Sequence, residues 1–192
     1  MTLTAEFPKT ISLAEFLILP ETKPAREYIN GKIHQKPMPQ GKHSTLQIRL
    51  GSAINQVSVP EQIAHAFTEL RCTFGGRSLV PDIAVFEWDN IPLDENGEVK
   101  NRFELFPDWI IEIVSPNQTD VSIVEKILFC LAQGTKLGWI VDPQNKLVII
   151  FQPDRQPEVK RNDEILTVLP VLDHWQLSAN KLFQFLTFQK NS

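Results

Sequence analysis

Short, nearly continuous apolar runs constrain the fold of this 192-residue chain more than any other feature. They cover residues 79–86, 109–114, 137–141 and 147–151, and each has the length of a strand rather than of a helix. Strands that are apolar on both faces are typical of a sheet covered on both sides. Helical patterns lie between and around these runs. The sequence therefore predicts an α/β fold with a central mixed β-sheet flanked by helices.

Capping residues and turn signals predict the other elements. An Asn30-Gly31 turn indicates a strand pair over 26–35, and weaker β segments are expected at 65–74 and 165–169. Four helices are expected: a short one after Ser12, with Glu15 completing a capping box; one from Ser44 to Pro60; one from Thr119 or Asp120 to Gly134; and one over 179–186 after Ser178.

Length and composition predict one domain over residues 1–192. Hydrophobic residues make up 42% and charged residues 22%, the mix of a globular protein. No apolar run nears the roughly 18 residues that span a bilayer, and residues 1–9 lack a signal-peptide pattern. Cys72 and Cys130 lie in apolar stretches, which favours reduced thiols. We therefore expect a cytoplasmic protein that does not bind membranes.

The charge is unevenly distributed along the chain. The net charge of −4 argues against a broadly basic surface. Between Lys23 and Leu50, however, six basic residues accompany a single acid, Glu27, so this segment carries +5. It includes Lys36, Lys42, His43 and Arg49, which are the candidate contacts for nucleic-acid phosphates.

Two carboxylates interrupt the apolar runs. Asp82 lies in residues 80–86 and Glu112 in residues 109–114, and an unpaired charge in a buried strand is costly. Each could pair with a buried arginine or lie at a strand end on the surface. Alternatively, the two converge on a cation, since neighbouring carboxylates repel one another without one.

Lys126 is a basic residue on the helix predicted to follow the Glu112 strand. On a helical wheel it falls at the edge of the apolar arc of the predicted 120–133 helix. There it either extends to solvent or reaches across the end of the sheet toward Glu112.

Several other chemistries lack their motifs. Gly75-Gly76 is not followed by the lysine of a phosphate-binding loop, and the chain has no Gly-x-Ser-x-Gly elbow. The two cysteines and four histidines do not have the spacing of a zinc site. Kinase, serine hydrolase, dinucleotide-dependent and zinc-binding functions are therefore not favoured.

Five segments, in order, resemble the Uma-two family of restriction-endonuclease-like proteins in the PD-(D/E)XK nuclease superfamily. They are residues 26–32 (REYINGK), His43 at a helix start, 80–83 (VPDI), 111–116 (IEIVSP) and 138–143 (GWIVDP). The resemblance covers nearly the whole chain and implies a restriction-endonuclease-like fold. Three positions depart from the pattern: Val114 replaces the lysine of the Glu-x-Lys triplet, Lys32 replaces an acid and Cys130 replaces a tyrosine.

The resemblance implies a nuclease that uses Mg²⁺ or Mn²⁺ to hydrolyse phosphodiester bonds, with DNA as its substrate class. Asp82, Glu112 and the Ile113 carbonyl would bind the metal, with Glu27 as a further candidate ligand. Lys126 would take over the role of the missing triplet lysine by orienting the attacking water or neutralising the phosphorane. The expected catalytic residues are thus Asp82, Glu112, Lys126 and Glu27.

Two other hypotheses remain open at the level of the sequence. Because Val114 carries no charge, the chain could be a binding or regulatory protein that keeps the nuclease fold without cutting. It could also be one subunit of a homodimer that pairs through Phe183, Phe185, Leu186 and Phe188, although these residues suit an ordinary core equally well.

Overall fold

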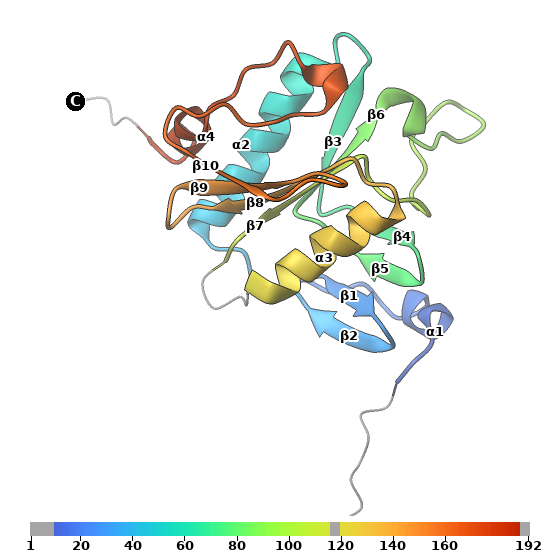
Figure 1. Ribbon diagram of the computed structural model, residues 1–192. Coiled ribbons are helices and arrows are strands. Elements are labelled where there is room, and N and C mark those ends of the chain that lie inside the picture. The colour runs from blue at the N-terminus through green and yellow to red at the C-terminus, as the bar shows by residue number, and fades with distance from the viewer. Residues whose placement is uncertain (1–9, 116–119, 189–192) are drawn as a thin grey trace, which may run out of the picture.

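The computed structural model describes residues 10–115 and 120–188 and contains two β-sheets with helices packed around them (Figure 1). The smaller sheet has the strand order β2-β1-β5-β4 and the larger has the order β10-β9-β8-β7-β6-β3. The larger sheet is mixed, because β7 and β8 are parallel whereas β6 and β7 are antiparallel. The strands are β1 (Arg26–Ile29), β2 (Lys32–Gln35), β3 (Ala64–Thr68), β4 (Cys72–Phe74), β5 (Arg77–Leu79), β6 (Ile83–Glu87), β7 (Trp109–Ile113), β8 (Leu137–Asp142), β9 (Leu147–Phe151) and β10 (Glu158–Arg161). The helices are α1 (Leu13–Leu17), α2 (Gly41–Ser58), α3 (Asp120–Gln133) and α4 (Ala179–Gln184).

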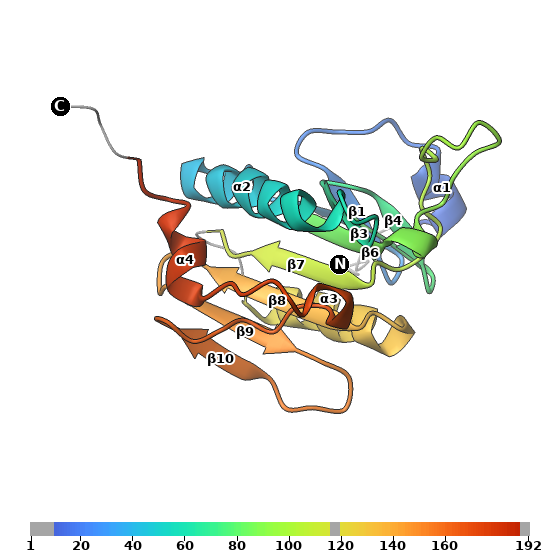
Figure 2. The same ribbon diagram turned by 90° about the horizontal axis from the view of Figure 1, so that it is seen from above.

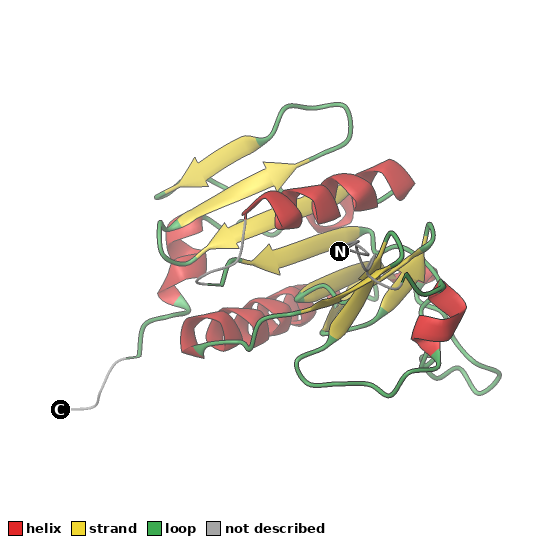
Figure 3. Cartoon of the chain, turned by 90° about the horizontal axis from the view of Figure 1, so that it is seen from below, coloured by secondary structure: helices red, strands yellow, loops and turns green. Residues whose placement is uncertain are grey.

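Helices cover both faces of the larger sheet, which confirms the predicted α/β class (Figures 2 and 3). Side chains alternate between the faces of a strand, so Ile111 of β7 packs in the core cluster beneath α2 and α4, whereas Ile110 packs beneath α3. Glu112 has the same parity as Ile110. The strand pattern alone therefore directs Glu112 toward α3.

The contact between α3 and β8 is unusually close at Gly138. A Cβ atom built there would lie 2.4 Å from Cγ2 of Ile127 on α3. Only a residue without a side chain allows the helix to approach the strand this closely.

The local signals near the N-terminus are confirmed. Ser12 and Glu15 form the capping box of α1, and the β1–β2 hairpin turns at Asn30 and Gly31. Both turn residues have positive φ, 51° and 81°, as a two-residue type I′ turn requires.

The prediction of one strand over 79–86 is wrong, because this segment crosses from one sheet to the other. β5 ends at Leu79 in the smaller sheet and β6 begins at Ile83 in the larger one. Pro81 has no N–H to donate to a sheet ladder, so the strand breaks there. Side chains satisfy the backbone instead: Val80 N–H donates to Glu27, and the Val80 carbonyl accepts from Lys36. Asp82 therefore lies immediately before β6 rather than within a strand.

Other boundaries also differ from the predictions. α2 begins at Gly41, three residues before Ser44. The strand predicted at 165–169 is reduced to one bridge, between Ile165 and Ser178, and the segment instead packs Leu166 and Leu169 into the core. The polar edge strand β10 was missed because its sequence has no apolar run.

The C-terminal helix α4 has the predicted Ser178 cap but ends at Gln184. Phe183 is buried in the core, and Phe185 and Leu186 pack against it, whereas Phe188 is exposed. Phe183 is thus a core residue rather than part of a free surface, and a homodimer remains a prediction.

Some sequence features fall outside the described residues: the N-terminal segment 1–9, Pro116 of the 111–116 motif, and the proposed Thr119 cap, together with the side chain of Asp120. Both cysteines are free and buried, as expected. Within the described residues, no helix combines the length and the apolar character needed to cross a membrane.

Candidate active site

The pairing of β6 with β7 brings Asp82 and Glu112 to the same end of the larger sheet. Ile83 lies opposite Ile111 in the antiparallel register, so the residue before Ile83 and the residue after Ile111 are neighbours. Asp82 is 2% exposed and Glu112 is 1% exposed. Asp82 Oδ2 accepts a hydrogen bond from the Ile113 N–H at 2.7 Å. The two carboxylates singled out in the sequence therefore converge. Asp82 itself lies outside the strands, and its side chain is fixed by the hydrogen bond from Ile113 of β7.

Glu27 reaches the same place from the smaller sheet. It lies on β1, is 5% exposed, and its Oε1 accepts from Val80 N–H at 2.8 Å. Val80 belongs to the segment that crosses between the sheets. Glu27 therefore joins the smaller sheet to the carboxylates of the larger one.

Lys126 reaches these carboxylates from helix α3. It lies on α3 beside the buried residues Ile123 and Ile127, and its Nζ donates to Glu27 Oε1 at 2.8 Å and to Glu112 Oε1 at 3.0 Å. The alternative in which Lys126 extends to solvent is wrong. The geometry agrees with what the family resemblance implied, while the catalytic role of Lys126 stays a prediction.

Burial and charge together set the protonation of this cluster. Burial raises the pKa of Glu112 to about 7; the Lys126 ammonium opposes this shift and Asp82 adds to it. Burial alone would lower the pKa of Lys126, but the Glu112 and Glu27 carboxylates outweigh it and raise that pKa. Lys126 is therefore an ammonium group at neutral pH and a hydrogen-bond donor only.

A second set of polar side chains surrounds Asp82. Lys36 Nζ donates to Asp82 Oδ1 at 2.7 Å, to the Val80 carbonyl at 2.8 Å and to Glu69 at 3.3 Å. His43 Nε2 lies 3.0 Å from Asp82 Oδ2 but is not aligned for a hydrogen bond, so it is a buried polar atom without a hydrogen-bond partner among the described residues. Burial lowers the pKa of His43, although Asp82 opposes the shift.

Gln47 and Glu69 were missed by the sequence reasoning. Gln47 Nε2 donates to both Glu69 Oε1 and the Asp82 carbonyl, each at 2.9 Å. Gln47 lies one helical turn after His43, and this i, i+4 spacing was the available signal. Glu69 lies outside the strands and offered no such signal.

The four candidate contacts for nucleic-acid phosphates have different surroundings. Lys36 and His43 are turned inward toward Asp82. Arg49 donates to the Phe185 carbonyl and lies over the ring of Phe188 at 4.4 Å. Lys42 is exposed, so its contact with phosphates stays a prediction.

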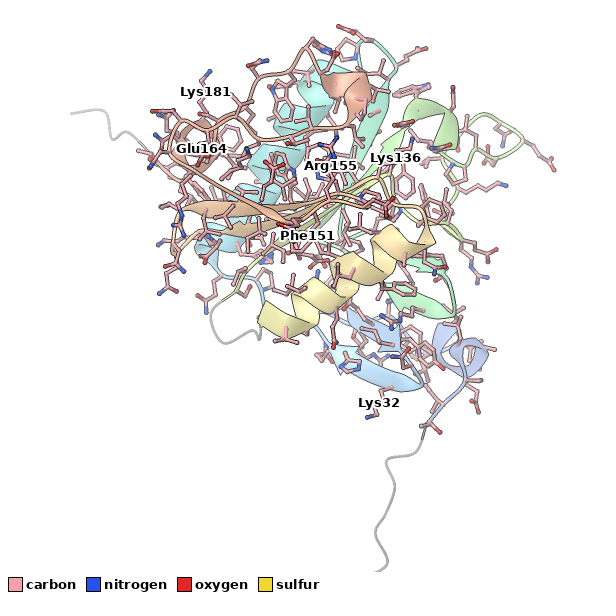
Figure 4. The ribbon with its side chains drawn as sticks, in the orientation of Figure 1. Lys32, Lys136, Phe151, Arg155, Glu164 and Lys181 are labelled. Carbon is pink, nitrogen blue, oxygen red and sulfur yellow. The ribbon has the colours of Figure 1, made fainter. Side chains whose placement is uncertain are left out.

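The three departures from the family pattern are also located. Lys32 is exposed and points away from the body of the protein (Figure 4). Cys130 lies on α3 and is buried, and burial raises the pKa of its thiol. Val114 is half-buried and packs at the edge of the α3 core cluster.

A cavity of about 650 Å³ opens beside the Asp82 cluster. Lys36, His43, Gln47 and Glu69 line it next to the carboxylates, and Pro24, Pro37, Met38, Pro39 and Arg71 supply much of the rest of its wall. The cavity thus borders the polar side chains that surround Asp82.

The donor set suits a hard divalent cation in its chemistry, because Asp82, Glu112 and Glu27 offer carboxylate oxygens. The unpartnered Nε2 of His43 beside Asp82 also fits a site that is completed by a further group. In this structure the ammonium groups of Lys36 and Lys126 provide the positive charge that faces Asp82 and Glu112. Among the described residues, no three His, Cys, Asp or Glu side chains are grouped so that they could hold a metal. The Ile113 carbonyl as a ligand stays a prediction.

Comparison with known proteins gives the family. The chain matches Uma2, described as "Putative restriction endonuclease", over residues 13–180. It is 50% identical to a protein of known structure described as a putative nuclease belonging to DUF820 from Anabaena variabilis ATCC 29413, with a TM-score of 0.90 over 92% of this chain and 99% of that chain. A DrdV–DNA complex is similar only at a TM-score of 0.31 and 15% identity, over 77% of this chain and 14% of that chain. No curated protein matches.

The family match spans most of the chain and includes every member of the buried cluster. The resemblance inferred from the five sequence segments is thus confirmed. The chain belongs to the Uma2 family, the family of putative restriction endonucleases.

Proposed function

We propose that this protein is a Mg²⁺- or Mn²⁺-dependent nuclease that hydrolyses phosphodiester bonds in DNA. One observation carries the proposal: Asp82, Glu112, Glu27 and Lys126 form a single buried cluster where the two sheets meet. Burying three carboxylates costs stability, so a cluster of this kind is expected at a functional site.

Asp82 and Glu112 would hold the cation, with Glu27 beside them. When bound, the divalent cation supplies Lewis-acid chemistry that polarises a phosphodiester oxygen. The Ile113 N–H fixes the orientation of Asp82, and the Val80 N–H fixes that of Glu27. These backbone bonds keep the carboxylate oxygens in place while the substrate binds.

Lys126 would act as a hydrogen-bond donor. Its ammonium is in contact with Glu112 and can orient a water molecule or stabilise negative charge on a phosphate oxygen. In the reaction, the water oxygen forms a bond to phosphorus, and the bond from phosphorus to the departing sugar oxygen breaks. The water gives up a proton to solvent, and the departing oxygen takes one up.

DNA would approach along the cavity beside Asp82. The exposed Lys42 belongs to the +5 segment and lies at the start of α2, one residue before His43. Because the chain as a whole carries −4, binding to DNA is expected to be weak and to depend on salt.

The test is cleavage of supercoiled plasmid in Mg²⁺ or Mn²⁺. Wild-type protein should nick the plasmid, and Asp82→Asn and Glu112→Gln should each lower the rate by at least about 100-fold. Glu98→Gln, in an exposed loop, is the matched control and should nick like the wild type. Equal nicking by all four proteins would contradict the assignment of the active site, and a single-stranded RNA arm would show whether DNA is the preferred substrate.

A second candidate function is a nuclease-fold protein that binds without cutting. It is favoured by the uncharged Val114 at the triplet position and by the ammonium groups that contact both Asp82 and Glu112. Metal-dependent nicking that disappears in Asp82→Asn would exclude this function.

A further inference from the structure

Lys36 places a buried ammonium group beside Asp82, where three oxygen atoms from different residues surround it. Its side chain is 9% exposed, and its Nζ lies 2.7 Å from Asp82 Oδ1, 2.8 Å from the Val80 carbonyl and 3.3 Å from Glu69 Oε1. A carbonyl and carboxylate oxygens are the ligands that hard metal cations use in proteins. Lys36 thus occupies a position that the surrounding atoms have shaped for a cation.

Both oxygens of Asp82 accept a hydrogen bond, and a divalent cation that binds Asp82 would come close to the Lys36 ammonium, whose positive charge repels it. Oδ2 accepts the backbone N–H of Ile113, which cannot leave without moving β7. Oδ1 accepts Lys36, whose ammonium is carried on a flexible four-carbon chain. Lys36 is therefore the contact that can be exchanged.

The displaced side chain has somewhere to go. Lys36 lines the cavity of about 650 Å³, together with His43, Gln47 and Glu69. Rotation of its side chain would carry the ammonium into this space without disturbing the apolar core.

We propose that Lys36 is an internal substitute for the metal ion: its ammonium neutralises Asp82 in the metal-free protein and is displaced into the cavity when a divalent cation binds. This inference rests on the proposed function, because it requires that Asp82 be a metal ligand. In this proposal the Lys36 ammonium competes with the metal ion for Asp82. A lysine that only contacts DNA would leave metal binding unaffected.

The test is calorimetric titration with Mn²⁺ in the absence of nucleic acid. Removing a competing cation should tighten binding, so Lys36→Met is expected to lower the Kd for Mn²⁺ by about tenfold, the scale on which groups around a metal site change its affinity. Lys32→Met is the matched control, because Lys32 is an exposed lysine of the same basic segment that points away from the body of the protein (Figure 4), and its Kd should equal that of the wild type.

The outcomes separate this inference from the proposed function. Tighter binding in Lys36→Met, including binding where the wild type gives none, supports the exchange. Equal or weaker binding in Lys36→Met overturns the exchange while leaving the metal-dependent nuclease intact. No binding by any of the proteins overturns both.

A second pair of variants covers the case in which Lys36→Met does not fold. Glu69→Gln removes one of the negative charges that Lys36 neutralises, so Lys36→Met combined with Glu69→Gln preserves the local charge balance. The double variant should bind Mn²⁺ more tightly than Glu69→Gln alone, and Mn²⁺ should raise its Tm further. No difference between these two proteins would overturn the exchange.

Discussion

Replacing Lys126 with methionine is the sharpest test of the electrostatics of the buried cluster. The side chain is 6% exposed, and its Nζ lies 2.8 Å from Glu27 and 3.0 Å from Glu112. Each pair contributes roughly 4 kcal/mol or more at an effective dielectric constant near 20, but burying the lysine itself costs several kcal/mol. Because the variant leaves two buried carboxylates without their shared cation, we expect a net loss of about 3–5 kcal/mol in the free energy of unfolding near pH 8.

The loss should depend on pH in a definite direction. Burial already raises the pKa of Glu112 to about 7, and removing Lys126, which opposes that shift, raises it further. Below this pKa, folded Glu112 holds a proton that the unfolded chain, with a pKa near 4.5, releases. The stability of the variant therefore rises as the pH falls from about 8 to about 5.5, and its deficit relative to the wild type shrinks.

Urea unfolding at the two pH values measures both effects. Adding Glu112→Gln to Lys126→Met should restore roughly 0.5–3 kcal/mol near pH 8, because it removes one of the two stranded charges. A deficit that is the same at both pH values, with no recovery in the double variant, would refute this account of the cluster.

Three further predictions concern packing, thiol reactivity and pH. Gly138→Ala should lower the free energy of unfolding by about 1–3 kcal/mol in urea, because the new methyl group would overlap the side chain of Ile127 on α3. Gly41→Ala is the control: its methyl group meets nothing within 4 Å, so it should not lower the free energy of unfolding comparably. Burial raises the pKa of the Cys72 thiol to about 12 and also raises that of Cys130, so a thiol reagent at neutral pH should label neither residue until denaturant is added; rapid labelling of the native protein would contradict this. Burial lowers the pKa of His65 below 6.5, so the folded state resists protonation of this side chain. The stability that neutral His65 contributes should be fully present above pH 6.5 and should be lost as the pH drops through the lowered pKa. His65→Gln should therefore flatten the dependence of Tm on pH between about pH 7 and pH 5.

The sequence predicted the fold class and the convergence of the two carboxylates because both follow from strand patterns. Asp82 and Glu112 interrupt apolar runs, and such charges must find partners wherever the strands pair. The strand break at Pro81 was also readable, since proline cannot donate to a ladder, but the apolar residues on either side concealed it.

The position of Lys126 could not be predicted from the helix alone. A helical wheel gives the angle between side chains, but not how closely or at what rotation the helix packs on the sheet. Here, the contact between Ile127 and Gly138 draws α3 onto β8, and the neighbouring lysine is thereby buried over Glu112. The family resemblance indicated that Lys126 lies near Glu112, whereas helical periodicity left its direction open.

Glu69 could not be predicted, and Gln47 was missed despite its i, i+4 spacing from His43, because polar residues in loops and on helices usually face solvent. The burial of Lys36 could not be predicted for the same reason, and its contact with nucleic-acid phosphates stays a prediction. Its neighbours Gln35 and Pro37 are exposed, yet its ammonium is held by oxygens from two distant segments of the chain. Only tertiary structure brings those segments together.

The crossing at Val80–Asp82 has a consequence for partial unfolding. Glu27 belongs to the smaller sheet, whereas Asp82 and Glu112 are anchored in the larger one, so the cluster exists only while the two sheets are docked. A fluctuation that releases the hairpin of β1 and β2 would remove Glu27, free the Val80 amide and leave Lys126 with one partner, while the larger sheet remained folded. The hydrogen-exchange rate of that single amide therefore reports how often the candidate active site comes apart in the native protein.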